Sequence, residues 1–74
     1  MIILNVKENK AYNMENVISI GVNDVELNCK VVGSAEKVVL AKFSSERLAI
    51  ETLKDILREY SLGKESVYCI RNVD

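Results

Sequence analysis

The chain has 74 residues, of which 49% are hydrophobic and 28% charged, and its net charge is −1 at pH 7. This composition is typical of one globular domain, residues 1–74, and excludes the disordered class. The near-neutral charge excludes a broad electrostatic attraction to nucleic acid or to an anionic membrane. No apolar run reaches membrane-spanning length, and the N-terminus lacks the basic region of a signal peptide, so we expect a cytoplasmic protein.

The N-terminal part of the chain predicts two short strands. Residues 2–6 form an apolar run of strand type, and the polar cluster at residues 7–10 suits a turn after it. Residues 11–16 are mixed and fit a short edge strand that returns against the first one. We therefore expect an antiparallel pair of strands at the start of the chain.

Residues 17–31 carry the clearest strand signal. Apolar and polar side chains alternate on both sides of Asn23 and Asp24, two residues that tolerate the positive φ of a tight turn. A two-residue loop at these positions pairs Val22 with Val25 and places the apolar residues of both strands on one face. The predicted apolar face consists of Ile18, Ile20, Val22, Val25, Leu27, Cys29 and Val31.

Residues 33–36 suit a second turn, and another apolar strand follows them directly. The register that this turn implies brings Val38 beside Val31. It also brings Leu40 beside Cys29, so the apolar face of the hairpin continues into a third strand.

The stretch between Phe43 and Gly63 predicts an amphipathic helix of about four turns. Ser44 is a good N-cap residue, and Gly63 lies where a left-handed C-cap belongs. With Ser44 as the cap, Phe43 and Leu48 have the spacing of a hydrophobic staple. The predicted apolar face consists of Ala49, Leu53, Ile56, Leu57 and Tyr60. The opposite side carries Arg47, Glu51, Lys54 and Arg58.

Three segments are apolar on both faces of their predicted strands, namely residues 2–4, 38–43 and 67–70. One helix covers only one side of a sheet, so these segments need a second cover. Either the sheet curls into a half-barrel or roll filled by its own residues, or the exposed face meets another subunit. The sequence thus predicts one α+β domain: an antiparallel meander of four to five strands, the helix, and a closing strand over residues 66–73.

Four segments carry a family resemblance: residues 2–5 (Ile-Ile-Leu-Asn), 16–20 (Asn-Val-Ile-Ser-Ile), 43–49 (Phe-Ser-Ser-Glu-Arg-Leu-Ala) and 63–68 (Gly-Lys-Glu-Ser-Val-Tyr). In these the chain resembles a family of short uncharacterised proteins from Gram-positive bacteria and their prophages. Members of that family often end the last strand in Met-Pro, whereas this chain has Cys-Ile-Arg at residues 69–71. The resemblance implies the same architecture and an origin in a mobile element, and it supplies no catalytic residue.

The sequence lacks the residues that most enzyme sites need. It contains no histidine, which excludes Ser-His-Asp and Cys-His catalytic groups and the common His-containing zinc sites. Phosphate-binding glycine loops and calcium loops are also absent from the sequence. Cys29 and Cys69 suit small buried hydrophobes with reduced thiols better than a redox pair. We therefore expect no catalytic residue, no metal and no cofactor.

Two hypotheses of function follow from this pattern. The leading one is a non-enzymatic protein that acts through a binding surface, as a homodimer joined by the uncovered sheet face. The alternative is a small-ligand binder, such as a phage counter-defence protein that sequesters a nucleotide signal in a pocket between subunits. A DNA-binding regulator is disfavoured, because the net charge is near zero and the pattern predicts no second helix.

Four residues are candidates for a ligand or interface site, because such a site needs basic and aromatic side chains: Lys30, Arg47, Tyr68 and Arg71. Packing in the core or at an interface is the simpler explanation of Tyr68. A solvated helix face with ion pairs is the simpler explanation of Arg47.

Overall fold

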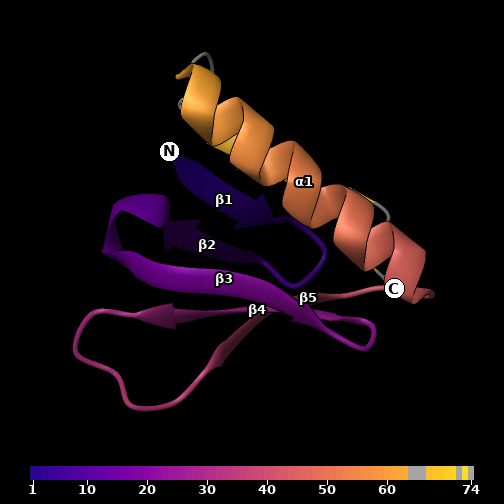
Figure 1. Cartoon of the computed structure of the whole chain (residues 1–74), viewed down its shortest axis with the longest axis horizontal. Coiled ribbons are helices and arrows are strands. Elements are labelled where there is room, and N and C mark those ends of the chain that lie inside the picture. Colours follow the sequence, from indigo (N-terminus) through magenta and orange to yellow (C-terminus); the bar gives the residue numbers. More distant parts are fainter. Residues whose placement is uncertain (64–66, 72, 74) are drawn as a thin grey trace.

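The computed structural model describes residues 1–63, 67–71 and 73 of the chain. Within these residues it is a small α+β fold, as the sequence predicts, with six strands, a short 3-10 turn and one α-helix that lies obliquely along one side of the strands (Figure 1). The elements are β1 (Ile2–Asn5), β2 (Lys10–Asn13), η1 (Met14–Asn16), β3 (Val17–Asn23), β4 (Glu26–Val31), β5 (Val38–Lys42), α1 (Glu46–Leu62) and β6 (Val67–Cys69). Its described helices include none with the length and apolar character that crossing a membrane requires.

The strands form two three-stranded sheets. The antiparallel meander is confirmed for β3, β4 and β5, while the N-terminal hairpin of β1 and β2 belongs to the other sheet, in the order β2-β1-β6. In that sheet β6 runs parallel to β1. An isolated bridge between Phe43 and Val73 links the two sheets, so the described strands make an open roll and do not close into a barrel.

The turn between β3 and β4 is one residue later than predicted. Asn23 pairs with Glu26, which makes Asp24 and Val25 the loop residues, and Asp24 takes the positive φ of 58°. Val22 consequently pairs with Leu27 and not with Val25. This change moves each partner by two residues, and because side chains alternate with a period of two, the partners keep the same face.

A β-bulge in β3 reverses the prediction for Ile18. The register shifts between Val17 and Ser19, so Ile18 is the extra residue of the bulge. Its side chain is 66% exposed, while Val17 is partly buried and packs on the core. The predicted inward position of Ile18 is therefore wrong, because the alternation pattern contains no signal for an inserted residue.

A second bulge changes the pairing of β4 with β5. Leu27 pairs with Ala41 and Asn28 pairs with Val39, which leaves Leu40 as the extra residue between them. Cys29 faces Val38, so the predicted pairs of Leu40 with Cys29 and of Val38 with Val31 are both wrong. The connection before β5 spans residues 32–37 and is longer than the predicted four-residue turn.

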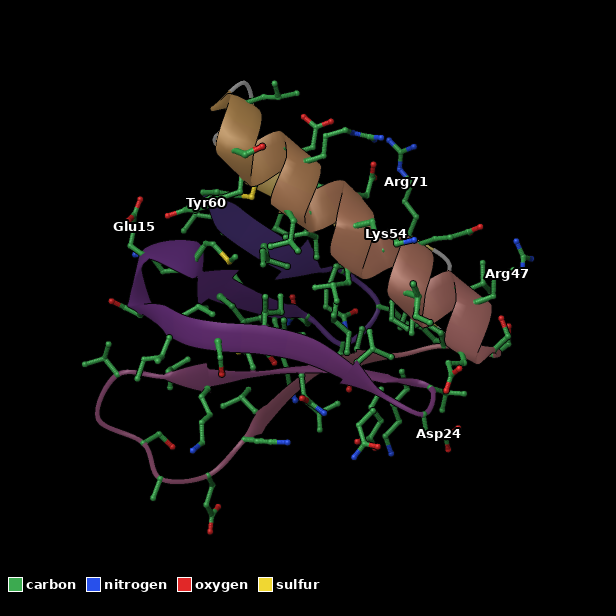
Figure 2. All side chains as sticks on the ribbon, viewed as in Figure 1. Glu15, Asp24, Arg47, Lys54, Tyr60 and Arg71 are labelled. Carbon is green, nitrogen blue, oxygen red and sulfur yellow. The ribbon has the colours of Figure 1, made fainter. Side chains whose placement is uncertain are left out.

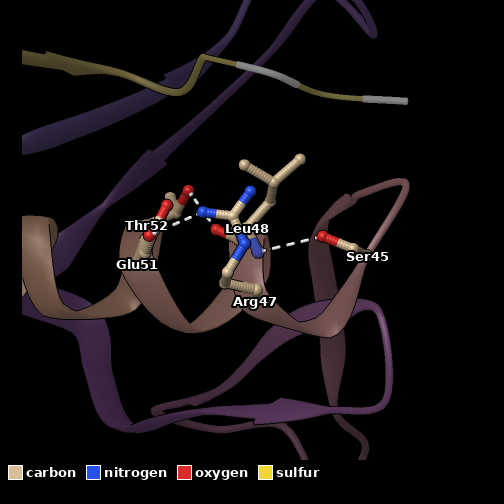
Figure 3. A network of polar contacts seen from close by, with 5 residues as sticks. All are labelled: Ser45, Arg47, Leu48, Glu51 and Thr52. Carbon is tan, nitrogen blue, oxygen red and sulfur yellow. Dashed lines mark hydrogen bonds and ion pairs between the residues drawn. The ribbon is translucent and has the colours of Figure 1, made fainter.

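The helix begins one residue later than predicted. Ser45 is the N-cap, and its hydroxyl accepts a 3.3 Å hydrogen bond from the Leu48 N–H (Figure 3). Ser44 is therefore outside the cap, and the spacing that made Phe43 and Leu48 a staple pair no longer applies. The predicted C-cap is confirmed, because Gly63 has a left-handed φ of 65° and its N–H donates to the carbonyls of the preceding turn.

The inward face of α1 is rotated relative to the prediction. Ala49 and Ile56 are buried as expected, but Leu57 and Tyr60 are 45% and 42% exposed. Thr52 takes an inward position, and its hydroxyl donates a 2.8 Å hydrogen bond to the Leu48 carbonyl. That hydrogen bond allows a polar side chain to be buried against the sheets. The four residues predicted for the opposite side are exposed or half-buried at the surface: Arg47, Glu51, Lys54 and Arg58.

The second cover of β5 comes from the chain itself, whereas Val67 and Cys69 of β6 stay exposed. Leu40 and Ala41 of β5 are both fully buried. Asn5 Nδ2 in β1 donates a 2.9 Å hydrogen bond to the Leu40 carbonyl, and the Tyr12 hydroxyl in β2 donates one to the Val39 carbonyl at 3.4 Å. The first sheet thus packs against β5 and fills the roll. The buried apolar core is Ile3, Met14, Leu27, Cys29, Leu40, Ala41, Phe43, Ala49, Ile56 and Ile70.

Candidate functional site

A hollow in the described surface lies between α1 and the C-terminal strand. It consists of two adjoining parts with volumes of about 450 Å³ and 330 Å³, which share Asp55, Arg58, Tyr68 and Arg71. We call it the α1–β6 groove. It is lined by residues of α1 between Leu48 and Glu59 on one side and by residues 67–69 and Arg71 on the other.

The helix period brings the α1 residues of the groove together. Leu48, Glu51, Asp55 and Glu59 follow one another at intervals of three or four residues, so they lie on one flank of the helix. Ser45 and Gly63 define the two ends of this flank by capping the helix. The sheet order β2-β1-β6 then places the last strand beside this flank.

A hydrogen-bonded group in the middle of the groove joins β6 to α1. The Tyr68 hydroxyl donates a 2.7 Å hydrogen bond to Asp55 Oδ2, and Arg58 forms an ion pair with Asp55 Oδ1. Burial raises the pKa of Tyr68, and the hydrogen bond to Asp55 and its negative charge raise it further, while Arg71 opposes them. Tyr68 is therefore a protonated donor at neutral pH, and both oxygens of Asp55 have partners.

A second ion pair engages the carboxylate of Glu51, which also lines the groove. Arg47 Nη1 lies 3.1 Å from Glu51 Oε1, one helical turn apart (Figure 3). Within residues 1–63, 67–71 and 73, Lys54 and Arg71 form no ion pair, and both line the groove. Figure 2 shows Lys54 and Arg71 close to each other along α1, with Arg47 nearer the start of the helix.

The structure brings together two of the four candidate residues from the sequence. Tyr68 and Arg71 both line the α1–β6 groove. Arg47 lies outside the lining and is engaged by Glu51. Lys30 lies on β4, where it borders a separate shallow hollow of about 130 Å³ together with Lys37. Within one chain the structure therefore brings Tyr68 and Arg71 together and leaves Lys30 and Arg47 apart from them.

Sequence reasoning missed the other charged residues of the groove: Glu51, Lys54, Asp55, Arg58 and Glu59. The two cations were assigned to a solvated face because Glu51 lies among them at ordinary helix-surface spacing. The spacing does place Asp55 and Arg58 on neighbouring positions, but it contains no information on which flank meets the last strand. That contact depends on how β6 pairs with β1.

Neither cysteine adds an obvious reactive centre to this site. Both are free thiols: Cys29 is buried in the core, and burial raises its pKa, while Cys69 is exposed at the end of the groove. In the part of the chain that the structure describes, no group of three Cys, Asp or Glu side chains is placed to hold a metal ion.

The chemistry that the groove offers is recognition of an anionic group. Among the described residues it presents two cations without an ion pair, Lys54 and Arg71, and one such carboxylate, Glu59, and its central tyrosine donates to a carboxylate whose oxygens are both engaged. Such a carboxylate is poorly placed to act as a general base. No family model, no curated protein and no solved structure matches this chain. The function therefore has to be inferred from these contacts.

Proposed function

We propose that this protein is a non-enzymatic binding protein of the cytoplasm, and that the α1–β6 groove is its recognition surface for an anionic segment of a partner protein. The observation that carries the proposal is the distribution of charge in the groove. Arg47 engages the carboxylate of Glu51, and Arg58 and Tyr68 engage that of Asp55. Within the described ranges Lys54, Arg71 and Glu59 form no ion pair, so the groove keeps two available positive charges against one negative charge.

The absence of histidine from the sequence supports a role in binding over one in catalysis, because histidine is the usual general base near neutral pH. Exposed ion pairs contribute only about 0.2 to 1 kcal/mol each and are screened by salt. We therefore expect an interaction of modest affinity that weakens as the salt concentration rises. Electrostatic complementarity of this kind mainly sets specificity and association rate.

A charge-reversal experiment with a matched control tests the proposal. The probe is a hexapeptide of alternating Glu and Val, titrated into the isotope-labelled protein and followed by NMR. The double variant Lys54→Glu, Arg71→Glu should lose binding, while Lys30→Glu, Lys37→Glu changes the net charge equally at the separate hollow on β4 and should retain it. Equal loss in the two variants would mean that the peptide responds to net charge alone, and the proposal would be wrong.

Self-association is the second part of the proposal, and we assign it to an exposed stripe of α1. Both faces of β5 are covered by the chain itself, whereas Ile50, Leu57 and Tyr60 leave an apolar stripe on the flank of α1 away from the groove. The chain's surface of 4780 Å² is close to the roughly 4,600 Å² expected of a folded monomer of its mass. Three half-exposed side chains also bury far less than the about 800 Å² per partner of a standard interface.

We therefore expect a weak homodimer that forms only at high protein concentration. Sedimentation equilibrium of the wild-type protein should show a concentration-dependent mass between one and two chains, and Leu57→Lys should return it to one. The matched variant Leu62→Lys places the same charge on an exposed leucine of another helix flank and should leave the mass unchanged. A wild-type protein that stays monomeric over the whole concentration range would contradict this part of the proposal.

Binding of a small ligand is the second candidate function. In this role the protein is a phage counter-defence protein that sequesters a nucleotide signal. This candidate is favoured by one observation: Tyr68 and Arg71 line the same hollow, whose volume of about 450 Å³ suits a ligand of that size. Native mass spectrometry of the protein purified gently from its host should then detect a retained small mass that Arg71→Glu loses. A protein that carries no extra mass in either form would count against this candidate.

A further inference from the structure

The part of the α1–β6 groove beside β6 runs along the edge of that strand. All three residues of β6, Val67, Tyr68 and Cys69, border the same hollow. Successive residues of a strand point to opposite faces. Tyr68 points to α1, since its hydroxyl reaches Asp55, while Val67 and Cys69 are exposed. A hollow that touches all three residues must therefore open along the backbone edge between the two faces.

One edge of β6 is already used. Residues 67–69 pair in parallel with Ile2, Ile3 and Leu4 of β1, and the Ile70 N–H continues the ladder with a 2.8 Å hydrogen bond to the Leu4 carbonyl. The opposite edge pairs with no other strand among the residues that the structure describes. An unpaired edge presents a row of N–H and C=O groups that can accept another strand.

We infer that this free edge of β6 binds an extended segment of a partner protein, which adds a strand to the sheet and carries acidic side chains toward Arg71, Arg58 and Lys54. The inference rests on the proposed function, because it names how the anionic partner is held in the α1–β6 groove. Main-chain pairing at a sheet edge provides affinity, and the pockets for alternate side chains provide specificity.

The two sides of the edge define the pattern of the bound segment. On the α1 side, Arg58 and Arg71 border the hollow beside β6 together with the carboxylates of Asp55 and Glu59, and Lys54 borders the adjoining part of the groove. Asp or Glu is therefore favoured at the positions that face the cations and disfavoured beside Glu59. On the other side the added strand lies beside the exposed Val67 and Cys69, which favour apolar residues at the positions between them. The partner segment is therefore an alternation of acidic and apolar residues.

Charge complementarity favours a peptide over a second copy of this chain as the occupant. Lys54 and Arg58 lie on α1 and Arg71 follows β6; among the described residues Lys54, Arg71 and Glu59 form no ion pair, which leaves the groove one excess positive charge for an acidic peptide to meet. A second copy that presented β6 to β6 would bring the same lining, with the same excess of positive charge, to one groove. Like charges on adjoining strands destabilise such a pairing.

The experiment selects peptides and then tests their conformation. Random heptapeptides displayed on phage are selected on the wild-type protein and counter-selected on Lys54→Glu, Arg71→Glu. We expect an alternating acidic and apolar consensus that binds this variant about tenfold more weakly, the equivalent of two exposed charge contacts. Far-UV circular dichroism checks that the variant folds, with Lys30→Glu, Lys37→Glu as the control of equal charge.

Two N-methylated forms of the best peptide then distinguish strand addition from other binding. In an added strand only alternate N–H groups face the neighbouring strand. Methylating the alternate N–H groups that face β6 should abolish binding. Methylating the N–H groups between them, which face away from β6, should leave the affinity within about twofold of that of the parent peptide. Hydrogen exchange of the β6 amides should also slow in the complex.

The outcomes separate the inference from the proposed function. If both N-methylated forms bind alike while the charge variant still loses binding, strand addition is wrong and the anionic groove stands. If no peptide prefers the wild-type protein over the charge variant, both are wrong. If the free protein already protects the β6 amides as a dimer and excludes every peptide, the occupant of the edge is a second copy and the inference is overturned.

Discussion

The hydroxyl of Tyr68 donates a 2.7 Å hydrogen bond to Asp55 Oδ2 and so fastens the last strand to the middle of α1. Arg58 holds the other oxygen of the same carboxylate. Because β6 has only three residues and pairs with one neighbouring strand, this side-chain contact is an important restraint on the width of the α1–β6 groove. The Asp55 carboxylate therefore both holds β6 against α1 and lines the proposed recognition groove.

Removing the hydroxyl tests that restraint. Tyr68→Phe keeps the ring and should lower the free energy of unfolding by about 1 to 2 kcal/mol, since the hydrogen bond to a charged acceptor is only partly shielded from water. Asp55→Asn should cost a similar amount by weakening the same contact. Urea denaturation of both single variants and the double variant measures the coupling between them. Strictly additive losses would show that the two side chains do not interact in solution.

The same contact predicts how stability changes at high pH. The folded-state pKa of Tyr68 lies above its ordinary value, because of burial first and then the hydrogen bond and charge of Asp55. A raised pKa stabilises the fold fully below the unfolded-state value of about 10, and the contribution is lost as the pH rises above it. The stability difference between the wild-type protein and Tyr68→Phe should therefore be constant up to about pH 9 and shrink above pH 10. Urea denaturation at three pH values measures it, and a difference that grows with pH would contradict the prediction.

Asn5 is a fully buried amide on which the packing of the two sheets depends. Its Nδ2 donates to Glu8 Oε2 at 2.8 Å and to the Leu40 carbonyl at 2.9 Å, while its Oδ1 accepts from the Glu8 N–H at 3.2 Å. Asn5→Asp has the same shape but replaces the donor by a charge that faces a carboxylate and a carbonyl. We expect a loss of about 3 kcal/mol or more at pH 7, the cost of an unpaired buried charge.

The pH dependence of this variant distinguishes charge from shape. The introduced carboxyl group has a folded-state pKa above that of the unfolded chain, so the variant should regain stability relative to the wild-type protein as the pH falls from 7 to 4. Asn5→Ala, which introduces no charge, should show no such recovery. Thermal unfolding across this pH range provides the measurement.

The position of the helix cap is testable with two adjacent serines. Ser45→Ala removes the hydroxyl that accepts from the Leu48 N–H and should cost about 1 kcal/mol. Ser44 is exposed and outside the cap, so Ser44→Ala should change the free energy of unfolding by less than about 0.5 kcal/mol. Chemical denaturation of the two variants compares them directly. The opposite order of effects would place the cap at Ser44.

The bulge in β3 predicts different costs for the same substitution at two isoleucines. Ile3 is fully buried, so Ile3→Val should cost about 1 kcal/mol through the lost methylene group and the small cavity that remains. Ile18 is 66% exposed, and Ile18→Val should be nearly neutral, within about 0.5 kcal/mol. Both changes keep a β-branched residue in a strand. Thermal unfolding that shows equal losses would mean that Ile18 is buried in solution.

Two of the four candidate residues from the sequence lie in the candidate site. Tyr68 and Arg71 were identified by their residue types near the end of the chain, and the structure places both in the groove. Lys54 and Arg58 have the right chemistry but occupy helix positions that are equally suited to solvent. Only the packing of α1 beside β6 decides which flank of the helix becomes a wall of the groove.

The sequence by itself determined the features that depend on residues close together in the chain. Gly63 specifies the left-handed end of α1, and alternation specifies the faces of β3 and β4 even where the pairing moved by two residues. Only the tertiary structure decided the two bulges, the parallel pairing of β6 with β1 and the contact of Tyr68 with Asp55. The physical reason is that a local pattern records which face of an element is apolar, whereas the partner of that face is chosen by burial and hydrogen bonding of the whole chain.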